Sequence, residues 1–179
     1  AIGGEVRGDL DVRIRGEARD PGTGILAGPD VLASTAAIRE ATAAAISRGE
    51  RPFLAGGCCA ELPGALAGAR DALGDVGLVH LDGHADLYDG VTSPTGEAAD
   101  MPVSVALGRG PRGWVEAAGG ASTAPERTAI VAYRDREESL RHGMAQPEEV
   151  GGLTHRPVEE VRAEGPGAVG AQTAAQLAE

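Results

Sequence analysis

Three residues that can bind a metal ion, Asp82, His84 and Asp86, alternate along the chain directly after an apolar run. The run, Val76 to Leu81, is short, rich in Val and Leu and followed closely by a glycine, as is typical of a buried parallel strand. If the backbone stays extended, the three side chains share one face, because side chains of a strand alternate between two faces. Two carboxylates and one imidazole suit a divalent ion of the manganese, iron or zinc kind. A fourth position would be filled from elsewhere in the chain or by water.

The same spacing has a simpler interpretation, in which the carboxylates cap the end of a strand and the histidine is merely solvated. Spacing alone leaves both interpretations open. A second glycine-rich stretch favours the metal site, since Phe53 to Cys59 is another short apolar segment that runs into a turn. A helical pattern over Glu61 to Leu73 connects this segment to the strand before Asp82. The order predicts a β-α-β unit whose two strand ends lie at one edge of a sheet.

Helical and extended patterns alternate through the rest of the chain. Val31 to Arg48 is Ala-rich, with apolar residues at helical spacing. The other expected elements are a strand over Leu10 to Ile14, a short helix over Met101 to Leu107, a strand over Ala129 to Tyr133 and a helix over Gly165 to Glu179. Trp114, within a glycine-rich connector, is expected to be a packing anchor. The pattern predicts an α/β fold, a three-layer α-β-α arrangement with a mainly parallel sheet, in a single domain over residues 1–179.

Two motifs carry a resemblance to a known family. Residues 56–60, Gly-Gly-Cys-Cys-Ala, resemble the Gly-Gly-Asp-His-Ser motif of the arginases, agmatinases and formiminoglutamases, the ureohydrolase family. Residues 82–86, Asp-Gly-His-Ala-Asp, resemble its Asp-Ala-His-x-Asp motif, and the interval between the two motifs agrees as well. Further similarity extends over residues 93–104 and 129–135. The resemblance runs from about residue 54 to the C-terminus and implies an arginase-like fold.

The resemblance also implies a set of metal ligands. In the family, the histidine of the first motif binds one of two manganese ions, and Cys59 stands in its place here. We therefore expect a divalent metal held by Asp82, His84, Asp86 and Cys59, with Asp86 as the catalytic residue. A thiolate is a soft ligand and manganese a hard ion, so Cys59 favours zinc or iron, or the loss of that ion.

A small guanidino or amidino substrate is the partner that the resemblance implies. The loop after the second motif holds the far end of the substrate in the family, so Thr95 and Glu97 are candidate contacts. Asp135 or Glu137 corresponds to an acidic residue that contacts the substrate amine. Ordinary interpretations remain open, because Glu97 is equally a solvated loop acid and Glu137 can pair with Arg141 on a helix surface.

Two departures from the family pattern bear on activity. The pattern continues into a strand ending in Asp-x-Asp, which supplies the remaining ligands, whereas the sequence stops at Glu179. Ala99 stands where the arginases carry a proton-shuttling histidine. The chain also begins at Ala1 without a methionine. We therefore expect an arginase-like fold that is incomplete at both ends, with weak metal binding and little or no turnover by residues 1–179.

Three functions fit the sequence. The first is a metal-dependent hydrolase of linear C–N bonds of the amidine or guanidine type, which acts through metal-activated water. The second is a mononuclear zinc amidohydrolase of the deacetylase type. The third is a catalytically inactive family member, in which the motif survives as a packing feature. The number of metal ions bound per chain distinguishes the three.

Composition narrows the class of protein. The formal net charge is −11, and the 16 basic residues are all arginine, so no basic patch is expected to bind nucleic acid or an anionic membrane. No apolar stretch is long enough for a transmembrane helix, and the two cysteines are adjacent, which is poor geometry for a disulfide. These features favour a cytoplasmic protein. The family resemblance adds the expectation of a homo-oligomer.

Overall fold

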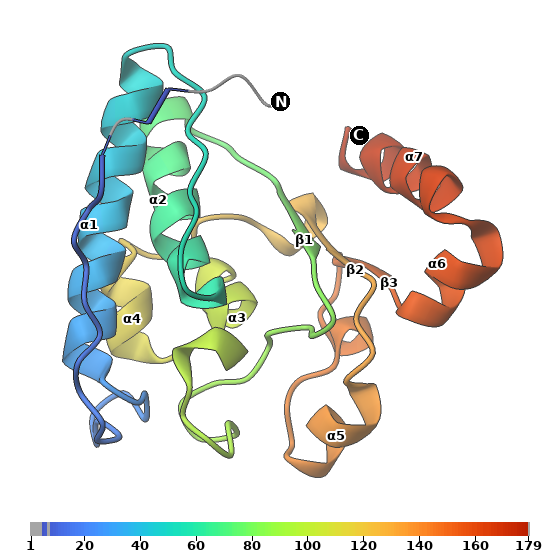
Figure 1. Cartoon of the computed structure of the whole chain (residues 1–179). Helices are drawn as coiled ribbons and strands as arrows, with labels where there is room; N and C mark the ends of the chain where they lie inside the picture. The colour runs from blue at the N-terminus through green and yellow to red at the C-terminus, as the bar shows by residue number, and fades with distance from the viewer. Residues whose placement is uncertain (1–4, 7, 179) are drawn as a thin grey trace.

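A parallel sheet lies at the centre of the computed structural model, which describes residues 5, 6 and 8–178. Its strands are β1 (Leu78–Leu81), β2 (Thr128–Val131) and β3 (Thr154–Arg156), and they are hydrogen-bonded in the order β1-β2-β3. The register aligns Leu81 with Val131 and Val131 with Arg156. The C-terminal ends of the strands therefore meet at one edge. Figure 1 shows the sheet between two groups of helices, which confirms the predicted α/β fold and its parallel strands.

One face of the sheet is covered by four helices. They are α1 (Gly28–Ser47), α2 (Leu62–Leu73), α3 (Pro102–Ala106) and α4 (Arg112–Ala117). Leu78 and Ile130 point into this side and join the main apolar core, which also contains Trp114 of α4. Helices α1 and α2 cross closely at Gly68, where an added Cβ would lie 2.4 Å from the carbonyl oxygen of Arg39. Among the described helices, none is long and apolar enough to cross a membrane.

The opposite face is covered only in part. Helices α6 (Val158–Glu164) and α7 (Pro166–Leu177) lie against it on the far side of β2 and β3 (Figure 1). Ala129, Val131 and Val169 form a small second core there, because alternate residues of β2 point to this side. On β1 the equivalent side chains stay open to solvent, with Val79 56% and Leu81 72% exposed.

Short elements complete the connections. Helix α5 (Arg136–Arg141) follows β2, and the 3-10 turns of the described residues are Cys59–Glu61 (η1), Ala98–Asp100 (η2), Pro125–Arg127 (η3) and Pro147–Glu149 (η4). The expected helices over residues 31–48, 61–73, 101–107 and 165–179 correspond to α1, α2, α3 and α7, although residue 179 lies outside the described part. The connector around Trp114 contains a helix, α4, that the glycine content concealed.

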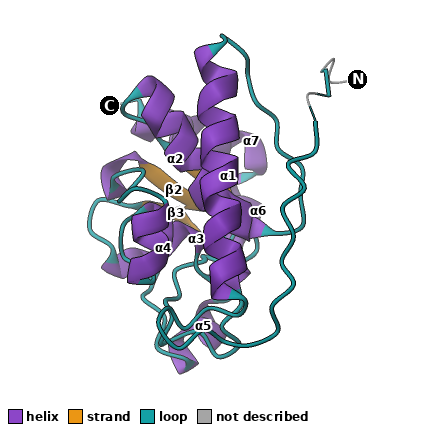
Figure 2. Cartoon of the chain, turned by 90° about the vertical axis from the view of Figure 1, so that its left-hand side faces the viewer, coloured by secondary structure: helices purple, strands orange, loops and turns teal. Residues whose placement is uncertain are grey.

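Two predicted strands are wrong. Phe53 and its neighbours form no strand, and the Phe53 side chain is 82% exposed, so the predicted β-α-β unit lacks its first strand. Residues 10–14 are also irregular, and Figure 2 shows the chain that descends from the N-terminus as a loop. Both segments have a strand-like apolar pattern, but neither has a neighbouring strand with which to share backbone hydrogen bonds.

Candidate metal centre

The metal motif lies in the loop that follows β1. The ladder reaches Asp82, whose backbone N–H donates to the Val131 carbonyl at 3.2 Å, and the backbone then bends. Asp86 has a left-handed conformation, with φ of 52°. The prediction of one extended face shared by Asp82, His84 and Asp86 is therefore wrong, because the strand ends before the motif does.

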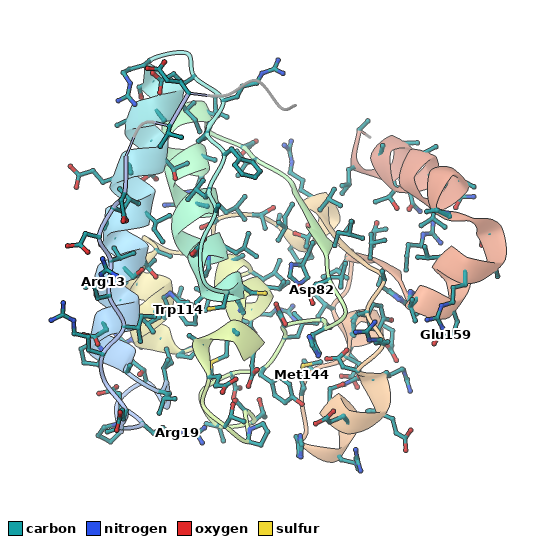
Figure 3. The ribbon with its side chains drawn as sticks, in the orientation of Figure 1. Arg13, Arg19, Asp82, Trp114, Met144 and Glu159 are labelled. Atoms are coloured by element: carbon teal, nitrogen blue, oxygen red, sulfur yellow. The ribbon has the colours of Figure 1, made fainter. Side chains whose placement is uncertain are left out.

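Asp82 contacts both His84 and Cys59, and Figure 3 shows it at the centre of the molecule where β1 ends. It accepts a hydrogen bond from the His84 backbone N–H at 3.0 Å and lies 3.4 Å from His84 Nδ1. Burial acts to raise the pKa of Asp82, but this hydrogen bond, the charge of His80 and the Cys59 thiol outweigh it, and the pKa is lowered. The His84 side chain itself is 66% exposed.

Asp86 folds back beneath the loop towards the strand. Its Oδ2 lies 3.2 Å from Nε2 of His80, a residue of β1, and both side chains are buried. The contact is within ion-pair distance without the geometry of a hydrogen bond. Neither atom forms a hydrogen bond with any other described residue. Asp86 is thus the most enclosed carboxylate of the motif.

Cys59 reaches the site from the turn before α2. Its Sγ donates to Asp82 Oδ2 at 3.6 Å. Burial, with the negative charges of Asp86 and Asp82, raises the pKa of the Cys59 thiol to about 12. The metal-free protein therefore holds this group as a neutral thiol, and Cys59 is a poorer candidate ligand than the carboxylates. Cys58 beside it is exposed, and both cysteines are free.

The loop after β2 meets the motif at the same edge of the sheet. Asp135 Oδ2 accepts a hydrogen bond from the Ala85 backbone N–H at 3.4 Å, while its Oδ1 is buried with no hydrogen-bond partner in the described part of the chain. Burial, with the nearby charge of Asp86, raises the pKa of Asp135. Glu137 lies exposed in the first turn of α5, and no ion pair joins it to Arg141 among the side chains described. Of these two candidates, only Asp135 is brought to the motif.

Thr95 and Glu97 lie in the loop before α3, and both are exposed. The Thr95 hydroxyl donates to Asp100 Oδ2 at 3.0 Å and accepts from the Glu97 backbone N–H at 3.0 Å. The hydroxyl of Ser93 donates to the same Asp100 oxygen at 2.8 Å. The loop is thus held by its own hydrogen bonds, and a substrate contact at Thr95 or Glu97 stays a prediction.

Two histidines near the motif escaped the sequence-based prediction. His80 precedes Asp82 by two residues, so strand alternation alone puts both on one face, and that signal was available in the sequence. His142 lies 3.3 Å through Nδ1 from the Tyr88 hydroxyl, across 54 residues of chain. No local pattern predicts that second contact, because it depends on how α5 packs against the loop.

The donors suit a divalent ion by their chemistry more than by their arrangement. No group of three or more His, Cys, Asp or Glu side chains is close enough to hold a metal ion in residues 5, 6 and 8–178. The donors meet in pairs, as Asp82 with His84 and Asp86 with His80. The carboxylate oxygens still fit a hard ion such as manganese. Asp82, Asp86 and His84 are the residues that would hold it.

Comparisons with known proteins agree on one family. A family model described as "Arginase family" matches residues 5–179. The arginase of Bacillus subtilis (strain 168) is 31% identical over 112 residues, which cover 62% of this chain and 38% of that protein. The arginase of Brevibacillus brevis is 30% identical over 97 residues, which cover 54% of this chain and 33% of that protein. The chain therefore spans well under half the length of these curated relatives.

Solved structures share the fold at lower identity. The arginase of Bacillus caldovelox gives a TM-score of 0.78 at 23% identity and covers 93% of this chain and 56% of that one. The formiminoglutamase of Trypanosoma cruzi, solved with Mn²⁺, gives a TM-score of 0.56 at 17% identity and covers 80% of this chain and 44% of that one. At such identities the similarity establishes the arrangement of the elements and leaves the chemistry to the residues themselves.

Proposed function

Because this chain belongs to the arginase family, we propose that it contributes to a metal-dependent hydrolase of linear C–N bonds in guanidino or amidino compounds. The metal is a divalent ion, manganese by analogy with the formiminoglutamase solved with Mn²⁺. Residues 1–179 alone are proposed to bind it weakly and to turn over little or no substrate, since their described donors meet only in pairs.

The observation that carries this proposal is a gathering of carboxylates at the ends of β1 and β2. Asp82 and Asp86 lie in the loop after β1, and Asp135 Oδ2 accepts a hydrogen bond from the backbone N–H of Ala85 in that loop, so all three carboxylates come to the same edge of the sheet. Oδ2 of Asp86 and Oδ1 of Asp135 are buried without a hydrogen-bond partner among the described residues. Like charges held together in this way favour a cation, whether a metal ion or a cationic substrate group.

We assign some residues of the site to binding the ion and others to binding the substrate. Asp82, Asp86 and the exposed imidazole of His84 would hold the ion at the C-terminal end of β1. When bound, a divalent ion lowers the pKa of water towards neutrality and supplies Lewis acidity. Asp86 would orient the attacking water as a hydrogen-bond acceptor. The free oxygen of Asp135 would accept a hydrogen bond from the substrate amine or guanidinium.

A catalytically inactive family member is the second candidate. It is favoured by the exposure of His84, the neutral Cys59 thiol and Ala99 in the place of the shuttle histidine. A mononuclear zinc amidohydrolase of the deacetylase type differs from both in holding one zinc ion. Thr95, Glu97 and Glu137 stay proposed substrate contacts, and a homo-oligomer is proposed from the family resemblance, which light scattering would check.

The experiment that tests the proposal is elemental analysis of the purified chain before and after loading with Mn²⁺ or Zn²⁺. Wild type, Asp82→Ala and a matched control, Asp75→Ala, are compared. Asp75 lies before β1, at the far end from the motif, and its side chain is 88% exposed. Because binding is proposed to be weak, we expect substoichiometric metal after loading in wild type and the control and less in Asp82→Ala, with little urea released from arginine or agmatine.

The outcomes separate the candidates. Metal that is retained and lost with Asp82 supports the hydrolase site, and one zinc per chain instead of manganese points to the deacetylase type. Absence of metal in wild type under both loadings would leave the inactive member as the better description. Rapid urea release by residues 1–179 would refute the weak activity proposed for this segment.

A further inference from the structure

We propose that His80 is a positioning residue for Asp86, which fixes the orientation of that carboxylate from inside the sheet. This inference rests on the proposed function, in which Asp86 is a metal ligand. His80 lies outside the metal motif, because it belongs to β1 itself and not to the loop. The assignment comes from the contact between the two side chains.

The first argument is location. His80 alternates with Leu78 on β1, and both point into the buried side of the strand, where they are 8% and 7% exposed. Asp86, only 3% exposed, lies six positions along and turns back on to the same side. The distance from His80 Nε2 to Asp86 Oδ2 is 3.2 Å. Two polar side chains of this degree of burial rarely meet by chance, since each would cost free energy if it were left alone.

The second argument is that neither atom has another partner. Nε2 of His80 and Oδ2 of Asp86 make no hydrogen bond to any other residue of the described chain. The backbone of Asp86 is already anchored, because its carbonyl accepts the Ser104 N–H at 3.2 Å. The Asp86 side chain is therefore the part of the residue that can still rotate, and His80 is the group that Oδ2 faces. A small rotation would turn the contact into a hydrogen bond.

The consequence concerns how the Asp86 carboxylate is oriented. With Oδ2 directed at His80, the Asp86 carboxylate would be held in one orientation towards an ion bound at the end of β1. Partners of this kind behind a metal ligand fix its orientation, and their loss typically weakens metal affinity about 10–100-fold.

The test compares His80→Leu with His80→Gln. Leucine fills the space without a donor, whereas the glutamine Nε2 can reach the position of the histidine Nε2 and donate to Asp86. Mn²⁺ affinity measured by titration calorimetry and by electron paramagnetic resonance should fall about 10–100-fold in His80→Leu and stay within about threefold of wild type in His80→Gln. A role limited to packing would give the opposite order, since leucine is the better core residue.

A matched control removes another imidazole from the same sheet. His155 of β3 lies 3.2 Å through Nδ1 from the Tyr133 hydroxyl, and among the described residues the ion pairs of Asp82 and Asp86 are with other histidines. His155→Leu should leave Mn²⁺ affinity unchanged. Equal loss in His155→Leu and His80→Leu, or wild-type affinity in His80→Leu, would overturn the positioning role.

A metal-free measurement separates this proposal from the proposed function. Amide hydrogen exchange of residues 84–88 should accelerate in His80→Leu and not in His80→Gln, because only the former frees the Asp86 side chain. If wild type binds no metal, the proposed function fails, and exchange alone decides the question. Unchanged exchange of residues 84–88 in His80→Leu would then reject the positioning role.

Discussion

The helical layer over one face of the sheet and the loops at the strand ends differ in how their buried polar groups are hydrogen-bonded. In the helical layer, Trp114 is fully buried and its Nε1 donates to Thr35 Oγ1 at 2.7 Å, while that hydroxyl donates to the Val31 carbonyl at 2.9 Å. At the strand ends, Asp86 and Asp135 each bury an oxygen with no hydrogen-bond partner in the described residues. The buried polar groups around Trp114 are hydrogen-bonded to one another, although the Thr42 hydroxyl elsewhere in α1 has no hydrogen-bond partner in the described residues. The strand ends bury two carboxylate oxygens without a hydrogen bond.

The difference indicates that the helical layer contributes mainly to the stability of the fold and the strand ends mainly to binding. Buried polar groups in a folded protein are normally hydrogen-bonded, and exceptions tend to mark sites that bind something. Substitutions in the helical layer should therefore act on folding alone. Substitutions at the strand ends should act on binding and can even stabilise the fold.

The largest effect is expected from Trp114→Ala. The change removes the largest buried side chain of the helical layer and the hydrogen bond to Thr35. We expect the free energy of unfolding to fall by about 3–5 kcal/mol, measured by urea denaturation. Trp114→Phe, which keeps most of the volume, should cost about 1–2 kcal/mol. A loss below that range for Trp114→Ala would show that the helical layer contributes little to stability.

A smaller effect is expected at the crossing of α1 and α2. Gly68→Ala places a Cβ 2.4 Å from the Arg39 carbonyl oxygen and 2.7 Å from Thr42 Cβ, so the helices must move apart. The cost should be about 1–3 kcal/mol in the free energy of unfolding. Gly170 on α7 is the matched control, because an added Cβ there meets nothing within 4 Å.

Gly170→Ala should stabilise the protein by up to about 1 kcal/mol, since alanine has the higher helix propensity. Thermal unfolding of both variants beside wild type makes the comparison. A Gly68→Ala protein as stable as Gly170→Ala would mean that the two helices do not pack as closely as the structure has them.

The sequence predicts elements well where the pattern and the packing agree. The strand before Asp82 and helices α1, α2 and α7 follow from apolar spacing. The apolar run of β1 predicts a buried strand, whereas β1 buries one face and leaves Val79 and Leu81 exposed. Phe53 is a residue type common in strands, but its segment has no adjacent strand with which to pair in the described sheet. A local sequence pattern cannot reveal whether such a strand is present. The alternation of helical and extended patterns predicts the parallel sheet, and β1 pairs with β2 in parallel.

The candidate site was predictable in part for the same reason. The identities of Asp82 and Asp86 follow from motif spacing, and the approach of Asp135 follows from the rule that parallel strand ends share an edge. The bend after Asp82 is a property of the loop as a whole, and it exposes His84 instead of aligning it with the carboxylates. Burial is the main cause that raises the pKa of the Cys59 thiol to about 12. The motif alone does not reveal how deeply Cys59 is buried.

The smallest effect, and the one that bears directly on the comparison, is expected from Asp135→Asn. Burial and the charge of Asp86 raise the pKa of Asp135 in the folded protein above its ordinary value. The folded state therefore binds the Asp135 proton more tightly than the unfolded state, and this contribution to stability is lost as pH rises through the folded pKa. Asparagine cannot ionise. The variant should thus gain about 1 kcal/mol over wild type at about pH 7 and much less at about pH 4.

Denaturant unfolding of both proteins at the two pH values measures this difference. Asp75→Asn, at an 88% exposed position before β1, serves as the control and should change stability by less than about 0.5 kcal/mol at either pH. A gain for Asp135→Asn that is equal at both pH values would assign the effect to packing and not to charge. A loss at about pH 7 would mean that the Asp135 carboxylate is already paired, and the strand ends would then be as well satisfied as the helical layer.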